Sequence, residues 1–452
     1  MKITLVQPKY PHGGDGKRQT YLPGGLMNVG SRLLKAGVTV EFVDLNIYSW
    51  GLAREMFARS DVIGFAVIGP PYIPSVVDSI RELRAKGFKQ SILVGGEGVV
   101  RIRAEHFDRW FDGLDVKQIR DDADIALACG IDSQSLPSAY VTSMVPMLEK
   151  LDPLLVSEYV TTEFSLFLSQ GCAYSCAFCS AAKGQKEEYR SIESLAEEVR
   201  FICAFLKRIK CDEMQVYVSN LDGFQTPDKF EECLRVISEI AEQYDITPSI
   251  RCLATSRCTF RACQADPELP RRLHGFGLDT VAFGADGADE ETWKRQNKNH
   301  NSLTELQFVC DAMKKVGITT ELLMVIGFQD DDMRSLWRDL KYSLRQAMKG
   351  RVIRPYLAKS QTPSGRWQDG SPEVEAFLND SELLLRLDYA MLGSVQTHPR
   401  FLQRLMANLV YMLIITALAP LGKCATRPLI PVPKGLLKLP AMIINRFMPF
   451  DR

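Results

Sequence analysis

Short apolar runs alternate with helical patterns in two separate blocks of this 452-residue chain, and this alternation limits the fold more than any other feature. In the first block the strand candidates are residues 2–8, 38–44, 61–69, 91–98 and 115–119. The segments 26–37 and 74–87 carry apolar residues at helical spacing and end on glycine, a common helix stop. Such alternation predicts an α/β fold with a parallel sheet.

The first block, residues 1–135, predicts a doubly wound (Rossmann/flavodoxin-like) parallel sheet. Such sheets bind ligands beyond the carboxyl ends of their strands, and Gly69, Gly95 and Gly96 stand at those ends. These glycines are candidates for close approach to a ligand. The alternative is that they only form tight turns, which glycine also favours.

Residues 136–162 show weak periodicity and contain three prolines, so we interpret them as a linker. The second block, residues 163–360, alternates again. Its strand candidates are residues 164–169, 213–219, 247–253, 279–286, 319–328 and 352–357. Six strand–helix units predict a (β/α)6 partial TIM barrel, with the active site at the carboxyl ends of its strands.

Residues 361–452 predict a mainly helical C-terminal extension. Residues 405–421 carry no charge, which suits a buried helix or a short bilayer span. The tail that follows mixes basic and large apolar residues, as segments that lie on an anionic membrane surface do. Packing of this extension on the barrel or on a second copy is the alternative.

The composition bears on two questions, nucleic-acid binding and the cellular compartment. The 55 basic and 55 acidic residues cancel, so nothing indicates a nucleic-acid partner. The first residues lack the apolar core of a signal peptide, and 12 cysteines in such a chain predict a reducing compartment. We therefore expect a cytoplasmic protein, with membrane association through the tail left open.

Three cysteines, Cys172, Cys176 and Cys179, stand at a C-x3-C-x2-C spacing directly after the first strand of the second block. Structural zinc prefers four ligands, and the next cysteine is Cys203. Three thiolates on one tight loop can hold three irons of a [4Fe–4S] cluster and leave the fourth iron open. These three residues are the candidate metal ligands.

This pattern, with Phe178 as the aromatic residue before the last cysteine, resembles the radical S-adenosylmethionine (SAM) superfamily. The resemblance implies that SAM chelates the open iron of the cluster. An external one-electron reductant of flavodoxin or ferredoxin type then drives cleavage of SAM to methionine and a 5′-deoxyadenosyl radical. That radical functionalises an unactivated C–H position of a small-molecule substrate.

Further segments resemble the auxiliary motifs of this superfamily. Ser219 and Asp222, in VSNLDGF, match the place where members contact the methionine part of SAM. Asp286 takes the place of the Glu in a Gly-Ile-Glu-Ser-Gly strand, which implies contact with the ribose hydroxyls. Gly327, in MVIGFQDD, matches the glycine motif beside the adenine.

The first block is similar to the cobalamin-binding domain that precedes the barrel in one radical SAM subclass. The similarity rests on LPGGLMNVGSRLLKAGVTVEFVDLN, DVIGFAVIGPPY and SILVGGEG, and implies cofactor contacts at Gly69, Gly95 and Gly96. It implies a cobalamin-dependent C-methyltransferase. No D-x-H-x-x-G segment supplies an axial histidine, and the histidines are scattered (His12, His106, His274, His300 and His398). Whether this domain keeps its cofactor stays open.

Two other functions stay open. The first is a cobalamin-independent radical rearrangement, oxidation or heteroatom insertion; the second is an iron–sulfur redox sensor or electron carrier. The basic, apolar tail favours a lipophilic substrate, although a polar natural-product intermediate fits as well.

Weaker signals have ordinary explanations beside the functional ones. Cys252, Cys258 and Cys263 suggest a second cluster or buried structural thiols, and Cys424 suggests a hydrogen donor, a methyl carrier or an inert residue. Residues 354–367, with Arg354, Tyr356, Lys359 and Trp367, form a substrate-facing rim or a solvated loop.

Overall fold

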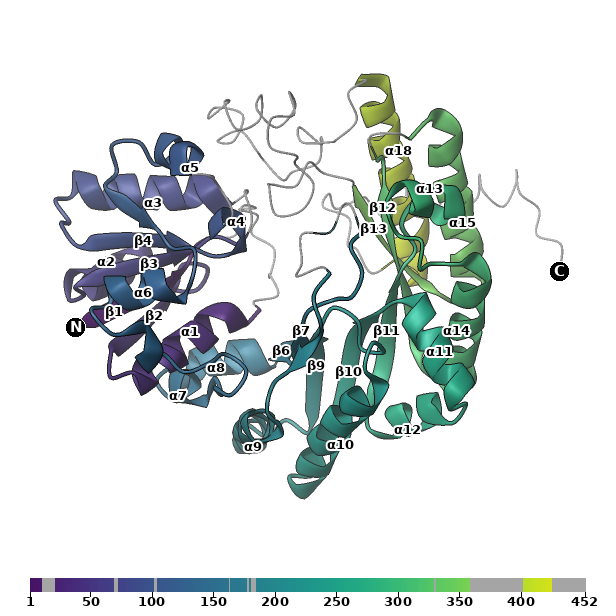
Figure 1. The fold of residues 1–452 in the computed structure, drawn as a ribbon, viewed down its shortest axis with the longest axis horizontal. Coiled ribbons are helices and arrows are strands. Elements are labelled where there is room, and N and C mark those ends of the chain that lie inside the picture. The colour runs from purple at the N-terminus through teal and green to yellow at the C-terminus, as the bar shows by residue number, and fades with distance from the viewer. Residues whose placement is uncertain are drawn as a thin grey trace.

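The computed structural model describes residues 1–9, 21–68, 72–100, 104–161, 163–176, 179, 184–328, 331–357 and 401–424. These residues form two α/β halves, each built around its own sheet, and the chain passes from one to the other near residue 160 (Figure 1). This architecture confirms the predicted fold class of a doubly wound sheet followed by a partial barrel.

The N-terminal sheet is parallel, with the strand order β2-β1-β3-β4-β5. Its strands are β1 (Lys2–Gln7), β2 (Thr39–Asp44), β3 (Val62–Ala66), β4 (Ser91–Gly95) and β5 (Val116–Gln118). The order reverses direction at β1 and β3, which is where doubly wound folds open a crevice for ligands.

Alternating side chains of this sheet bury two opposite faces. Ile3 and Leu5 of β1 belong to one apolar cluster, whereas Val6 belongs to the other. The first face is covered by α1 (Gly24–Lys35) and α6 (Asp122–Ala128), and the second by α2 (Trp50–Ala58), α3 (Ile73–Ala85) and α5 (Ala104–Trp110). The short α4 (Glu97–Val100) follows β4. Burial on both faces explains why the strands read as nearly continuous apolar runs.

The connecting segment is helical and packed. It contains α7 (Val145–Leu148) and α8 (Pro153–Val160), and their apolar side chains join the first-face cluster. The fully buried Tyr159 donates from its hydroxyl to Asp44 Oδ2 at 2.7 Å. Prolines at the first turns of both helices fit this arrangement, because a missing N–H costs nothing there.

The second sheet is also parallel, with the order β13-β12-β11-β10-β9-β6. Its strands are β6 (Phe164–Phe167), β9 (Glu213–Ser219), β10 (Thr247–Ala254), β11 (Leu278–Gly284), β12 (Thr319–Ile326) and β13 (Val352–Leu357). The helices between them are α9 (Ile192–Arg208), α10 (Pro227–Gln243), α11 (Ser256–Ala265), α12 (Leu269–Gly275), α13 (Glu290–Arg295), α14 (Leu303–Lys315) and α15 (Met333–Met348). Within the described residues, β6 and β13 are the two edges of this half barrel.

The helix α18 (Phe401–Leu418) covers the β13 edge and packs beside α15 (Figure 1). Val410 and Ile414 lie on its buried inner face. Just beyond the helix, the backbone of Cys424 forms an isolated parallel β-bridge with Ile353 of β13. The described part of the predicted C-terminal extension therefore packs on the barrel. In that part of the chain no helix combines the length and apolar character needed to cross a membrane. The basic tail after residue 424 lies outside the described residues.

Candidate metal centre and cofactor site

The three candidate cysteines share one loop that leaves the carboxyl end of β6. Two short antiparallel strands, β7 (Ser169–Gln170) and β8 (Glu188–Tyr189), close the loop at its base. Backbone hydrogen bonds fold the loop on itself: Gln185 N donates to Cys172 O at 3.1 Å and Cys179 N to Cys176 O at 3.2 Å. Phe178 lies outside the described residues.

Side chains from other strand ends fasten this loop to the barrel. Gln225 Oε1 accepts from the backbone N–H of Ala173 at 2.8 Å. The amide of Asn297 donates to Ser175 O at 2.8 Å and to its hydroxyl at 3.1 Å. Because these partners follow β9 and β11, the loop is held against the carboxyl edge of the sheet.

Tyr174, between the first two cysteines, makes a third attachment. Its ring stacks on His300 with centroids 3.7 Å apart, and its hydroxyl lies 3.2 Å from Cys258 Sγ. Burial raises the pKa of Tyr174 and lowers that of His300 to about 3, so both rings are neutral at physiological pH.

Two thiols of the loop, those of Cys172 and Cys176, have raised pKa values. Burial is the main cause that raises the pKa of Cys172 and brings that of Cys176 to about 11, and Lys298 opposes the second shift. Among the described side chains, no group of three or more His, Cys, Asp or Glu stands together at metal-ligand geometry. The donor set itself, three soft thiols on one short loop, fits an iron–sulfur cluster and does not fit a hard cation such as Mg²⁺.

Ser219 and Asp222 lie where β9 ends. Asp222 is 1% exposed, and its carboxylate accepts hydrogen bonds from Thr255 Oγ1 at 2.6 Å, from Thr255 N at 3.1 Å and from Phe224 N at 3.2 Å. Burial raises its pKa, and these donors oppose the shift. The carboxylate thus joins the ends of β9 and β10, and both of its oxygens accept hydrogen bonds from these segments.

Asp286 lies just after β11, in the short turn η3 (Asp286–Ala288). Its Oδ2 is 2.5 Å from Lys298 Nζ, which also donates to Gly284 O at 2.9 Å. Asn301 donates to the same carbonyl at 2.7 Å. Sequence reasoning missed Asn297, Lys298 and Asn301, although the polar run NKNHN after α13 was a usable signal.

Gly327 follows β12 in a left-handed conformation, with φ of 83°. A Cβ here would lie 2.7 Å from Ala407 Cβ of α18. Asp331 Oδ2 accepts from Gly327 N at 3.1 Å and from Phe328 N at 2.8 Å. Packing of α18 is therefore sufficient to require glycine at this position.

Two of the three candidate glycines of the N-terminal half are described, and Gly69 lies outside the described residues. Gly96 has φ of 102°, and a Cβ there would lie 2.6 Å from Val67 O. A Cβ on Gly95 would lie 3.2 Å from Ile119 Cβ. Both glycines lie at the carboxyl end of β4, and close contact between backbone segments explains Gly96.

The structure gathers the cysteine loop, Ser219, Asp222, Asp286 and Gly327 at the carboxyl edge of one sheet, because parallel strands end on the same side. Gly95 and Gly96 lie at the carboxyl edge of the other sheet.

Several of the cysteines outside the loop are buried, Cys252 and Cys263 among them. Cys258 contacts Tyr174 among the described residues of the loop. Cys424 lies beyond α18. Lys359 and Trp367 of the predicted rim, and His12 and His398, lie outside the described residues.

Comparison with known proteins agrees with this arrangement. Residues 166–340 match the family model of the radical SAM superfamily. The methyltransferase TsrM from Kitasatospora setae, solved with cobalamin and a [4Fe–4S] cluster, superimposes with a TM-score of 0.59 at 15% identity, over 80% of this chain and 76% of that one. The cobalamin-dependent radical enzyme OxsB, with aqua-cobalamin and SAM bound, gives 0.57 at 14% identity, over 85% and 56%.

A curated relative matches a shorter stretch. Bacteriochlorophyllide d C-12(1)-methyltransferase of Chlorobaculum tepidum is 21% identical over 172 residues, which is 38% of this chain. The match spans about a third of that relative, 35% of its length.

A loop of three cysteines at the carboxyl edge of a six-stranded parallel half barrel, behind a doubly wound domain, defines a two-part α/β protein of the iron–sulfur class. The part of the chain that matches the family model, residues 166–340, is a radical SAM domain.

Proposed function

We propose that this protein is a radical SAM enzyme that cleaves SAM reductively and functionalises an unactivated C–H position. Cys172, Cys176 and Cys179 would hold a [4Fe–4S] cluster, which supplies the low-potential electron for SAM cleavage when bound. The observation that carries the proposal is the position of this loop, after the first strand of a half barrel that matches the radical SAM model. A small-molecule substrate and an external one-electron reductant belong to the same proposal.

The chain's own residues would bind and orient SAM at this edge. The Asp286–Lys298 pair is buried beside the end of β11, within reach of the loop through the neighbouring Asn297. Asp286 would meet the ribose hydroxyls with its remaining oxygen, while Lys298 holds the carboxylate in place. Asp222 would act indirectly, by holding the β9 turn that carries Ser219.

We propose further that the reaction is a cobalamin-dependent C-methylation. Two cobalamin enzymes share the fold over both halves of the chain, 80% and 85% of its length. Cobalamin supplies a methyl carrier when bound, and Gly95 and Gly96 lie at the strand ends where a doubly wound sheet receives such a ligand. No axial histidine is expected, since the D-x-H-x-x-G motif is missing from the sequence.

A second candidate function is radical chemistry without cobalamin, such as rearrangement, oxidation or heteroatom insertion. The observation that favours it is the environment of Gly96. Any side chain at this position would clash with Val67 O, so the requirement for glycine is explained without a cofactor.

We also propose peripheral contact with an anionic membrane and a lipophilic substrate. Three leucines of α18 (Leu402, Leu405 and Leu409) are between 46% and 60% exposed and recur at helical spacing. The sequence after residue 424 adds Lys434, Lys438 and Arg446. Apolar and basic groups together favour such surfaces. Co-flotation with vesicles containing phosphatidylserine, and its loss when the three leucines are replaced by Gln, tests this contact.

The decisive experiment uses protein reconstituted anaerobically with iron, sulfide and hydroxocobalamin, and then desalted. We expect about four irons per chain, about one cobalt, and deoxyadenosine after SAM and a reductant are added. Iron with deoxyadenosine but without cobalt would favour the second candidate. Iron without deoxyadenosine would contradict the enzyme proposal and favour an electron carrier or redox sensor.

A further inference from the structure

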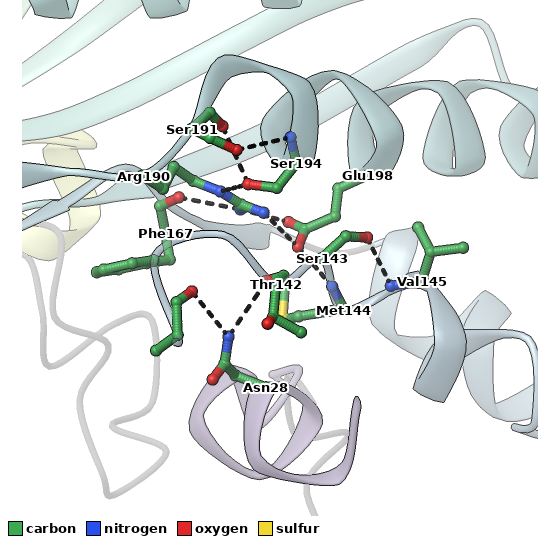
Figure 2. A network of polar contacts seen from close by, with 11 residues as sticks. Asn28, Thr142, Ser143, Met144, Val145, Phe167, Arg190, Ser191, Ser194 and Glu198 are labelled. Atoms are coloured by element: carbon green, nitrogen blue, oxygen red, sulfur yellow. Dashed lines mark hydrogen bonds and ion pairs between the residues drawn. The ribbon is translucent and has the colours of Figure 1, made fainter. Parts of the chain in front are cut away.

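The side chain of Arg190, which stands where the chain returns from the cysteine loop, holds the base of that loop together (Figure 2). Its backbone N–H donates to Leu168 O at 2.9 Å, next to the β7–β8 pairing. Its guanidinium reaches the carbonyl of Phe167, the last residue of β6, at 3.2 Å. Arg190 therefore joins the entry of the loop to its exit.

The same guanidinium forms a buried ion pair with Glu198 of α9. Two parallel N–H groups lie 2.8 Å from the two carboxylate oxygens, and the side chains are 2% and 0% exposed. Ser194 Oγ accepts from Nε at 3.0 Å. Such bidentate geometry is rigid and directional.

Glu198 has a further partner that lies outside the barrel. Its Oε1 accepts from the backbone N–H of Met144 at 2.7 Å, in the segment that connects the two halves (Figure 2). A second bond next to the pair, from Ser191 N to Tyr140 O at 2.8 Å, holds the same segment. The loop base and the connecting segment thus share one buried carboxylate.

The connecting segment is bonded in turn to α1 of the N-terminal half. Asn28 donates to Thr142 O at 3.4 Å, and Arg32 donates to Pro137 O at 2.6 Å. The helix α1 follows β1, so its first turn lies at the carboxyl edge of the N-terminal sheet, where ligands of such sheets bind. Hydrogen bonds on both sides of the connecting segment therefore link the base of the cysteine loop to α1.

We propose that Arg190 and Glu198 are a positioning pair, which sets the register between the cysteine loop and the N-terminal half. The consequence for function rests on the proposed cobalamin-dependent reaction: two cofactors held by separate halves need a fixed separation. A buried ion pair alone would be weak evidence, since apolar residues often replace such pairs without loss of stability. The hydrogen bond that Glu198 accepts from Met144 N–H gives this pair its additional role.

The test compares two variants with a matched control in the protein as purified. Glu198→Gln breaks the pair, and Arg190→Met/Glu198→Leu replaces it with apolar side chains of similar size. Glu239→Gln, in the exposed i,i+4 pair with Arg235 on α10, is the control. Hydrogen–deuterium exchange of peptides covering residues 139–147 is measured beside peptides of β9 and α10. Iron content after reconstitution and the affinity for hydroxocobalamin are measured as well.

We expect exchange at 140–145 to accelerate at least tenfold in the double variant, because Met144 N–H there loses its acceptor. The acceleration should be smaller in Glu198→Gln, whose amide oxygen can still accept from Met144, and β9 and α10 should be unchanged in both variants. We also expect hydroxocobalamin affinity to fall at least fivefold while iron content stays near that of the wild type. Normal protection of 140–145 in a folded double variant would overturn the proposal, as would unchanged affinity. If Glu198→Gln does not fold, the apolar double variant decides alone. Failure of the wild type to bind hydroxocobalamin would contradict the proposed cofactor, and the exchange result would still decide the role of the pair.

Discussion

The ammonium group of Lys298 lies 2.5 Å from the carboxylate of Asp286, and their side chains are only 7% and 5% exposed. Lys298 also donates to Gly284 O at 2.9 Å, so one ammonium group binds both the carboxylate and the last carbonyl of β11. A buried charge without its partner is strongly unfavourable. The pair therefore fixes the orientation of Asp286 before any ligand arrives.

Replacing Lys298 by Met should lower the free energy of unfolding by about 3 kcal/mol, because the carboxylate of Asp286 is left buried and unpaired. Urea unfolding monitored by circular dichroism measures the change. Lys294→Met, on the exposed side of α13, removes the same charge and should change stability by less than about 0.5 kcal/mol. Equal effects of the two substitutions would contradict the role of the buried pair.

Replacing Asp286 by Asn should weaken SAM binding while iron content stays unchanged. The amide keeps the shape of the side chain but lacks the negative charge that strengthens the hydrogen bonds accepted from the ribose hydroxyls. Equilibrium dialysis with labelled SAM on reconstituted protein measures the affinity, and we expect a loss of at least about tenfold, or about 1.4 kcal/mol. Wild-type affinity in this variant would remove Asp286 from the SAM site.

Replacing Cys176 by Ala should abolish both the cluster and deoxyadenosine formation, because two thiolates cannot hold a cluster that requires three. Iron analysis and chromatography of the SAM products are the measurements. Cys211→Ala is the control, because Cys211 is a half-buried thiol after α9, far along the chain from the loop. Full iron content in the Cys176 variant would contradict the assignment of the metal ligands.

Asp339 of α15 gives a prediction about pH. Its side chain is fully buried, and in the described part of the chain neither carboxylate oxygen makes a hydrogen bond. Burial is the largest cause that raises its pKa well above the usual value, and the negative charge of Asp331 adds to the shift. The folded state therefore holds a proton that the unfolded chain releases above about pH 4.

With a raised pKa in the folded state, the contribution to stability is complete below the unfolded pKa and is lost as the pH rises through the folded one. Asp339→Asn replaces the titrating carboxyl with a neutral amide, so the loss of stability at high pH disappears. The variant should be more stable than the wild type by at least about 1 kcal/mol at pH 8, with the gain shrinking towards pH 5. Urea unfolding across this range measures it, with the exposed Asp212→Asn as control. A gain that is independent of pH would contradict the explanation.

The strand–helix alternation could be interpreted from the sequence because burial on both faces leaves a continuous apolar signal in each strand. The predicted strand at 319–328 ends at Ile326 in the structure, since Gly327 turns out of the sheet with φ of 83°. The segment 136–162 has weak periodicity but contains α7 and α8, whose short lengths hide a helical period.

The side chains that hold the site were harder to predict. Lys298 and Asn297 lie far from the cysteines in sequence, and only the parallel ends of β6 and β11 bring them near the loop. Arg190 and Glu198 are eight residues apart on a segment that reads as an ordinary amphipathic helix start. The hydrogen bond from Met144 to Glu198 depends on how the two halves dock, and local sequence patterns carry no such information.

The contact between Gly327 and Ala407 provides a double-mutant cycle for the docking of α18. Gly327→Ala places a Cβ 2.7 Å from Ala407 Cβ and strains a backbone with φ of 83°. We expect it to lower the free energy of unfolding by about 2 to 3 kcal/mol, of which about 1 kcal/mol comes from the left-handed backbone. Ala407→Gly alone should cost about 1 kcal/mol, the propensity loss of a helix interior.

The double variant decides whether the two positions touch. If α18 packs on the end of β12, removal of the Ala407 methyl makes room for the new Cβ. The double variant should then be more stable than the sum of the single effects predicts, by about 1 kcal/mol. The backbone strain at Gly327 is not relieved, so recovery should be partial. Strict additivity, measured by urea unfolding of all four proteins, would mean that α18 does not rest on this turn in solution.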